Sequence, residues 1–216
     1  MEFIDAFIRS APIFGQGLLI TLALTGLTIV FSVILGLIIL GLKVSRFTPL
    51  NWFANTYLAI VRGMPLIALL FVIYFGIVNI IRVDAFTAAT IGLSIHTSAY
   101  MAEIFRSGLS SVPKGQTEAA RSLGMSRVQT LRKVISPQAL RVVVPALANQ
   151  AILSLKDSSV AAFITVEELF LTAQRLSAAS FQPLTFYTIV SIYYLAVVGI
   201  MTFIAQRVER YYGKRG

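Results

Sequence analysis

The chain has 216 residues, of which 57% are hydrophobic and only 12% charged, and its formal net charge is +9 at pH 7. Soluble domains carry about 25% charged residues, so this composition argues against a soluble protein and indicates a chain that lies largely in a membrane. The sequence contains no cysteine, which excludes disulfides and thiolate metal sites. Because the basic residues lie between apolar runs, as membrane topology requires, we expect no nucleic-acid partner.

Segments without charged side chains indicate where the chain can cross a membrane. Residues 10–42, 63–81 and 176–206 contain no Lys, Arg, Asp or Glu. A helix needs about 20 apolar residues to span hydrocarbon, because every backbone polar group must be satisfied within the segment. At the start of the chain, apolar residues recur at helical spacing within residues 1–14. This pattern predicts a short interfacial helix that leads into the first span, and no signal peptide.

In chain order, the sequence predicts five membrane spans at residues 18–42, 64–81, 86–105, 139–155 and 183–205. Five spans place the two termini on opposite sides of the membrane. Lys and Arg accumulate on the cytoplasmic side of membrane proteins. With a cytoplasmic C-terminus, 14 of the 18 basic residues lie on that side, including those before the second predicted span. We therefore expect an external N-terminus and a cytoplasmic C-terminus.

The segment of residues 107–136, between the third and fourth spans, differs from the other loops. It predicts two short helices that are broken at Gly124, with Ser126 as the cap of the second helix. Pro137 is expected to end that helix and to open the next span. One side of the pair is polar and basic, and the other is apolar, with Leu123, Met125, Val128, Leu131 and Val134. From the residues alone, docking on a protein and lying on anionic lipid remain open.

Several motifs resemble a known family. The series Glu118, Ala119, Ala120, Gly124 and Pro137 resembles the EAA loop of bacterial ABC importer permeases, which docks on the ATPase subunit. The chain departs from the usual pattern only near the end of the loop, at residues 134 and 136. Across residues 17–206, further segments resemble the polar amino acid branch of histidine, arginine and glutamine permeases: residues 62–66, 99–103, 106–108, 111–116 and 155–159.

This resemblance implies an all-α membrane protein with five transmembrane helices, of the type I ABC importer permease (MetI-like) kind. Residues 1–216 would form one transmembrane domain, with residues 107–136 as its cytoplasmic coupling segment. The implied partners are two cytoplasmic ATPase subunits, an external solute-binding protein and a second permease subunit, identical or different, in a bacterial cytoplasmic membrane. The sequence has no G-x-x-x-x-G-K-[ST] phosphate loop, so we expect a transport subunit without cofactor, whose partner binds ATP.

Polar residues inside the third and fourth predicted spans are candidates for a substrate site, because ionisable groups at membrane depth usually face a cavity or a partner. Two helical stripes carry them, each at i, i+4 and i+7 spacing. The first stripe is flanked by Thr97 and Ser98, and the second by Lys156. If both stripes line one cavity, it offers acceptors and donors for a zwitterionic amino acid. The stripes are His96, Tyr100 and Glu103, followed by Gln150, Ser154 and Asp157.

Each candidate also has a structural interpretation. Glu103 can pair with Arg106 one turn later, Lys156 and Asp157 can form an interhelical tie, and His96 can be a buried core residue. Two carboxylates at membrane depth favour a basic L-amino acid as substrate, with glutamine or glutamate as the alternative. A channel would need no surface that binds an ATPase, so the EAA-like loop argues against a channel. A membrane enzyme would need a convergent catalytic set, and a single His with no Cys makes that unfavourable.

Overall fold

The computed structural model of the chain describes residues 2–78 and 83–213, so the end of the second predicted span, Arg82 and Lys214 lie outside the described residues. The described chain is helical throughout, and the predicted all-α class is confirmed. The elements are α1 (Glu2–Lys43), α2 (Thr48–Gly63), α3 (Leu66–Val78), α4 (Ala85–Ser110), α5 (Lys114–Ser122), α6 (Arg127–Thr130), a π-helix (Leu131–Ile135), α7 (Ser136–Asp157), a 3-10 helix (Ser158–Ile164), α8 (Leu169–Ser180) and α9 (Pro183–Gly213).

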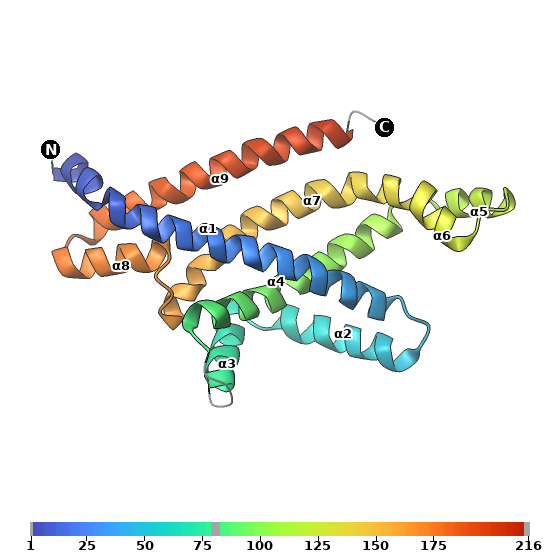
Figure 1. The fold of residues 1–216 in the computed structure, drawn as a ribbon, viewed down its shortest axis with the longest axis horizontal. Helices are drawn as coiled ribbons and strands as arrows, with labels where there is room; N and C mark the ends of the chain where they lie inside the picture. Colours follow the sequence, from blue (N-terminus) through green and yellow to red (C-terminus); the bar gives the residue numbers. More distant parts are fainter. Residues whose placement is uncertain (1, 79–82, 214–216) are drawn as a thin grey trace.

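The long helices lie along the long axis of the molecule (Figure 1). Helices α5 and α6 project at one end of this axis, whereas α8 lies near the opposite end, beside the start of α1. Helix α9 runs from the α8 end toward the α5–α6 end. The core lies where α1 packs against α4, with a stripe of buried hydroxyls on α1 that consists of Thr21, Thr25, Thr28 and Ser32.

The short N-terminal helix predicted to lead into the first span is present and is continuous with that span, and its interfacial position stays a prediction. Helix α1 runs from Glu2 to Lys43 as one helix of 42 residues, with Pro12 inside it. Tertiary contacts hold its first turns, because the ring of Tyr193 on α9 stacks on Phe7 and Phe14 at centroid distances of 5.9 and 5.2 Å. Residues 1–14 alone do not show this contact with α9.

The start of the second predicted span is preceded by a further helix. The described part of α3, Leu66–Val78, covers 13 residues of that span, whose residues 79–81 lie outside the described residues. It follows α2 after a break with a bend of 110° between the two helices. Pro65 lies in this break, and Met64 before it is extended, as a residue that precedes proline prefers. Helix α2 buries Ala54, Leu58 and Val61 in the packed bundle. Arg62 therefore lies in a packed helix and not in a loop, and its predicted cytoplasmic position stays a prediction.

Three of the described helices are long and apolar enough to cross a membrane: Phe3–Lys43, Arg127–Ile164 and Pro183–Tyr212. The bent pair of α2 and α3 makes a fourth if it is counted as one span. Helix α4 has 26 residues and carries a buried polar series that lowers its hydropathy. The count of five spans and the sidedness of the termini stay predictions.

Cysteine labelling tests the sidedness. Glu168 at the α8 end is fully buried, so a labelling site there must be chosen nearby, at Phe181, whose side chain is 89% exposed. We expect Phe181→Cys to react with an impermeant thiol reagent from outside intact cells, and Arg210→Cys on α9 to react only after permeabilisation. The native chain has no cysteine, so the background is clean. The opposite pattern would overturn the orientation inferred from the basic residues.

Candidate functional site

The coupling segment, residues 107–136, forms two helices that are broken where the sequence predicts. Gly124 adopts φ +80°, a left-handed conformation that glycine reaches without strain. Ser126 then caps α6: its Oγ accepts the N–H of Gln129 at 3.2 Å, and its own N–H donates to Gln129 Oε1 at 2.8 Å. This reciprocal capping box fixes the start of α6. The predicted break and cap are both confirmed.

The prediction that Pro137 ends the second helix is wrong. Helix α6 continues through the π-helix Leu131–Ile135 into α7, and Arg127–Ile164 is one candidate span of 38 residues. The N–H of Ser136 bonds to the carbonyl of Leu131, five residues earlier. Such a wider turn changes the hydrogen-bond ladder locally, and Pro137 then falls in the first turn of α7, where its missing N–H costs little.

The tip of the coupling segment presents apolar side chains to its surroundings. Leu123 is 83% exposed and Val128 72% exposed, and Glu118 lies on the exposed surface of α5. Of the motif residues, Ala119, Gly124 and Pro137 are also exposed, whereas Ala120 is buried. Exposed apolar residues gathered at one end of a protein mark an interaction surface. We call Leu123, Val128 and Leu131 the coupling patch.

Glu103 lies in a cluster of three basic side chains. Its carboxylate accepts from Lys43 Nζ at 2.6 Å and from Arg106 Nε at 2.8 Å, and Arg62 Nη1 is 3.9 Å away. The pairing with Arg106 that the sequence suggested is present. The contact with Lys43 spans 60 residues and joins α1 to α4, so no local pattern could have indicated it. Glu103 is therefore already paired within the chain.

The structure brings part of the two stripes together. Tyr100 and Glu103 from α4 and Gln150 from α7 line one cavity of about 330 Å³. On the other side of Tyr100 and Glu103, a second cavity of about 470 Å³ is bounded by Lys43 and Arg62. Tyr100, Glu103 and Gln150 of the two stripes thus lie at one cavity, and their role in binding a substrate stays a prediction.

Other stripe residues are buried polar groups without a partner. Among the described residues, His96 Nδ1, Thr97 Oγ1 and Ser154 Oγ are buried and have no hydrogen-bond partner. Ser98 differs, because its hydroxyl lies 2.6 Å from the hydroxyl of Tyr57 and donates to the Ile95 carbonyl at 2.8 Å. Buried polar atoms are rarely left without partners, so these atoms are open to a ligand or water, as are Thr28 Oγ1 and Ser94 Oγ at the contact of α1 and α4.

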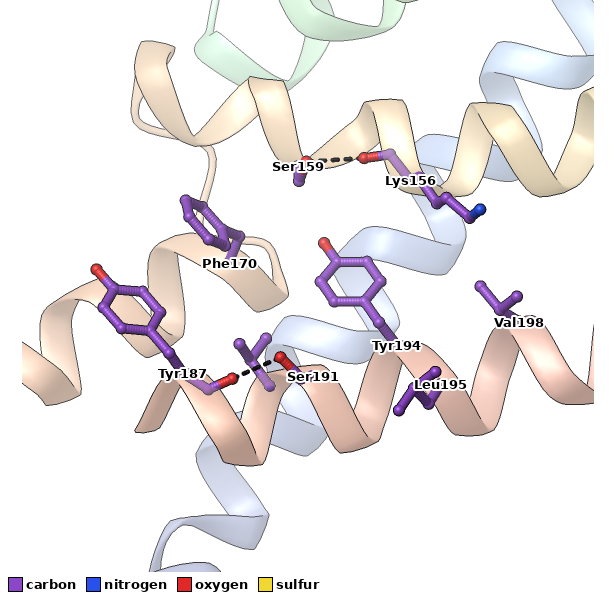
Figure 2. A pocket seen from close by; sticks show the side chains of 9 residues that line it. Lys156, Ser159, Phe170, Tyr187, Ser191, Tyr194, Leu195 and Val198 are labelled. Atoms are coloured by element: carbon purple, nitrogen blue, oxygen red, sulfur yellow. Dashed lines mark hydrogen bonds between the residues drawn. The ribbon is translucent and has the colours of Figure 1, made fainter. Parts of the chain in front are cut away.

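Asp157 and Lys156 point to different surroundings. Asp157 is partly buried at the end of α7 and interacts electrostatically with His96 on α4. In the described part of the chain, no basic side chain lies within 4.0 Å of its carboxylate. Lys156 instead extends from α7 toward Val198 on α9 (Figure 2) and lines a separate groove of about 610 Å³. The two neighbours therefore do not share one cavity.

Glu168 is a buried carboxylate that sequence reasoning did not identify as part of the core. It caps α8, accepting the N–H groups of Phe170 at 2.9 Å and Leu171 at 2.8 Å, and the Tyr194 hydroxyl donates to it at 2.8 Å. Burial raises the pKa of Glu168, although these three donors act in the opposite direction. The only local signal is an acidic residue directly before a helix. Its partner on α9 comes from 26 residues later.

The sequence of this chain is similar to those of known transport proteins. Residues 29–212 match the model of the family "binding-protein-dependent transport system inner membrane component". The chain is 39% identical to the probable amino-acid ABC transporter permease protein YckA of Bacillus subtilis, covering 95% of this chain and 91% of YckA. It is 34% identical to the arginine transport system permease protein ArtQ of Bacillus subtilis, with 95% of both chains covered. The glutamine transport system permease protein GlnP of Escherichia coli is 35% identical, with 92% of both covered.

A solved structure agrees with these relatives over the whole fold. A crystal structure of an amino acid ABC transporter with histidines superposes with a TM-score of 0.92 and 35% identity, and covers 98% of this chain and 99% of that one. The MetI-like permease fold implied by the sequence motifs is thereby confirmed. The chain belongs to the binding-protein-dependent transport system inner membrane components, and within that family it is the permease subunit of an amino-acid ABC transporter.

Proposed function

We propose that this permease helps to import a basic L-amino acid across a bacterial cytoplasmic membrane, and that the interface of α4 and α7 holds the amino acid. The observation that carries the proposal is the set of buried polar atoms without partners on His96, Thr97 and Ser154, with the unpaired carboxylate of Asp157 nearby. These groups can accept an ammonium or guanidinium and donate to a carboxylate. They come from two neighbouring helices, so closure or opening between the helices would make or break the site.

The substrate class follows from which carboxylate is free. Glu103 has three basic neighbours, whereas Asp157 has no ion pair among the described residues. An unpaired carboxylate at membrane depth is costly, and a cationic substrate would offset that cost. Asp157 is therefore the residue that we assign to the cationic group, and Tyr100, Glu103 and Gln150 shape the neighbouring cavity.

A glutamine-type substrate is the second candidate, and one observation favours it. Because Glu103 is already paired, Asp157 is the one of the two candidate carboxylates that is left for a substrate. Its carboxylate could bind the α-ammonium of any amino acid. The relatives do not separate the two, since the names of similarly identical proteins specify arginine and glutamine.

The transport cycle would use the expected partners. Two ATPase subunits would bind the coupling patch, a second permease subunit would complete the pathway, and an external solute-binding protein would deliver the amino acid. The helix that starts at Arg127 in the coupling segment continues to Asp157. A displacement of α6 by ATP-driven closure would therefore reach Ser154 and Asp157 through one helix, without crossing a loop.

Direct binding to the assembled complex tests the site. Losing a charge-assisted contact costs about 1.5–3 kcal/mol, which is about ten- to a hundredfold in affinity. We expect Asp157→Asn to weaken arginine binding by that factor, without dismantling the complex. Glu103→Gln should lower arginine transport as well, but with loss of assembled complex, because three basic groups lose their partner.

Glu167→Gln is the matched control, because Glu167 is an exposed carboxylate paired with Arg175 on α8. It should bind arginine like the parent. If Asp157→Asn also binds arginine as tightly as the parent, Asp157 is not the acceptor. If the parent binds glutamine more tightly than arginine, the substrate is of the glutamine type and not basic.

A further inference from the structure

The groove between α7 and α9 has a volume of about 610 Å³ and lies next to Lys156, a charged residue that the α4–α7 site leaves unexplained. Lys156 and Ser159 line it on one side, and α9 lines the other (Figure 2). The remaining lining is apolar or aromatic except for Ser191, and it consists of Phe170, Tyr187, Val190, Ser191, Tyr194, Leu195 and Val198. We call this the α7–α9 groove.

The groove lies at membrane depth. Its α9 residues, 187–198, fall inside the charge-free run of residues 183–206. Val198, toward which Lys156 extends, precedes Arg207 by nine residues, which is about 14 Å along a helix. A charged side chain at this depth is costly unless it faces a water-filled cavity, a partner or a ligand. A polar occupant of the groove would offset the cost of a charge at the position of Lys156.

Within residues 2–78 and 83–213, no carboxylate pairs with Lys156. Lys156 is exposed, and no carboxylate of the described residues lies within 4.0 Å of its ammonium. The neighbouring hydroxyls are engaged as donors: Ser159 to the Lys156 carbonyl and Ser191 to the Tyr187 carbonyl, both at 2.7 Å. The Tyr194 hydroxyl donates to Glu168 at 2.8 Å. The groove thus offers one strong cationic donor and no anion.

Aromatic rings cover the other part of the groove. The rings of Phe170 and Tyr187 lie 5.9 Å apart between centroids, and the ring of Tyr194 is next to Lys156 in the same view (Figure 2). Aromatic faces attract cations, and the attraction is stronger where water is excluded. A molecule with a carboxylate at one end and a cationic or polar side chain at the other matches this arrangement.

We propose that Lys156 binds the α-carboxylate of the transported amino acid in the α7–α9 groove, while the substrate side chain lies against Phe170 and Tyr187. This inference rests on the proposed function, because it takes a basic amino acid as the ligand. The groove is a second contact point, on the opposite side of α7 from the cavity of Tyr100, Glu103 and Gln150. An amino acid that moves past α7 would exchange one set of contacts for the other.

Comparing the affinities for arginine and for agmatine, which lacks only the carboxylate, distinguishes a carboxylate-binding role of Lys156 from a structural role. Both are titrated against the assembled complex in phosphatidylcholine nanodiscs. We expect the parent to bind arginine about ten- to a hundredfold more tightly than agmatine. Lys156→Gln should lose most of this ratio through weaker arginine binding, while agmatine binds as well as before or better. Lys156→Arg should retain the ratio, because a cation remains.

Arg210→Gln on α9 is the control for loss of one positive charge, and it should leave the ratio unchanged. An unchanged ratio in Lys156→Gln overturns the proposal, as does an equal loss of affinity for both ligands. If the parent binds neither ligand, the basic substrate class fails instead. Glutamine and 4-aminobutanamide, which again differ by the carboxylate, then test Lys156 in the same way.

Discussion

Replacing Gly124 with valine should abolish coupled transport while leaving the chain in the membrane. Gly124 adopts φ +80° between α5 and α6, and a β-branched residue is strongly disfavoured there. The left-handed conformation costs an L-residue about 1–2 kcal/mol, and more when it is β-branched. The two helices would then change their mutual angle, and the coupling patch would no longer match the ATPase. We expect transport in reconstituted vesicles to fall by about tenfold or more, because about 1.4 kcal/mol corresponds to a factor of ten.

Gly115→Val is the matched control for this change. Gly115 lies in α5 of the same coupling segment, has no positive φ, and no heavy atom lies within 4 Å of an added Cβ. It should transport nearly as well as the parent. ATPase activity that no longer responds to loaded binding protein in Gly124→Val would show uncoupling, and loss of the ATPase on purification would show failed docking. Transport at the parent rate would exclude a docking role for this turn.

Replacing Gly36 with valine should destabilise the whole bundle. A Cβ at Gly36 would lie 2.8 Å from the Cβ of Met101, 3.1 Å from the backbone nitrogen of Ala102 and 3.2 Å from the carbonyl of Ser98. Two of these atoms belong to the backbone of α4 and cannot move by a change of rotamer. Helix α4 would have to move away from α1, and this movement would also separate Lys43 from Glu103. Overpacking typically costs about 1–3 kcal/mol, and contact with backbone places this site at the upper end.

Gly26→Val on the same helix is the control, because no heavy atom lies within 4 Å of a Cβ at that position. We expect a lower thermal midpoint and a lower yield of monodisperse complex for Gly36→Val, measured by size-exclusion chromatography after heating. Gly26→Val should behave like the parent. Equal stability of the two variants would show that the close approach of α1 and α4 is not required.

The parts of this protein that the sequence determines by itself depend on neighbours a few residues apart. The break at Gly124 and the cap of α6 by Ser126 involve groups within four residues of one another, so the sequence pattern alone predicts them. The charge-free runs likewise indicate α1 and α9, because hydrocarbon selects apolar helices whatever their packing. The motif resemblance indicates the family for the same reason, since Glu118, Ala119, Ala120, Gly124 and Pro137 lie in one continuous segment.

Tertiary structure decided the rest. The first turns of α1 contact Tyr193, which comes from α9 at the other end of the chain. The ion pair of Lys43 and Glu103 joins residues 60 apart. Lys156 and Asp157 are adjacent in the chain, yet the rotation of α7 places them toward different helices. The rotation of a helix about its own axis is set by its contacts with other helices. For α1, one such contact is the close approach of Gly36 to α4. No spacing of residues within one helix specifies this rotation.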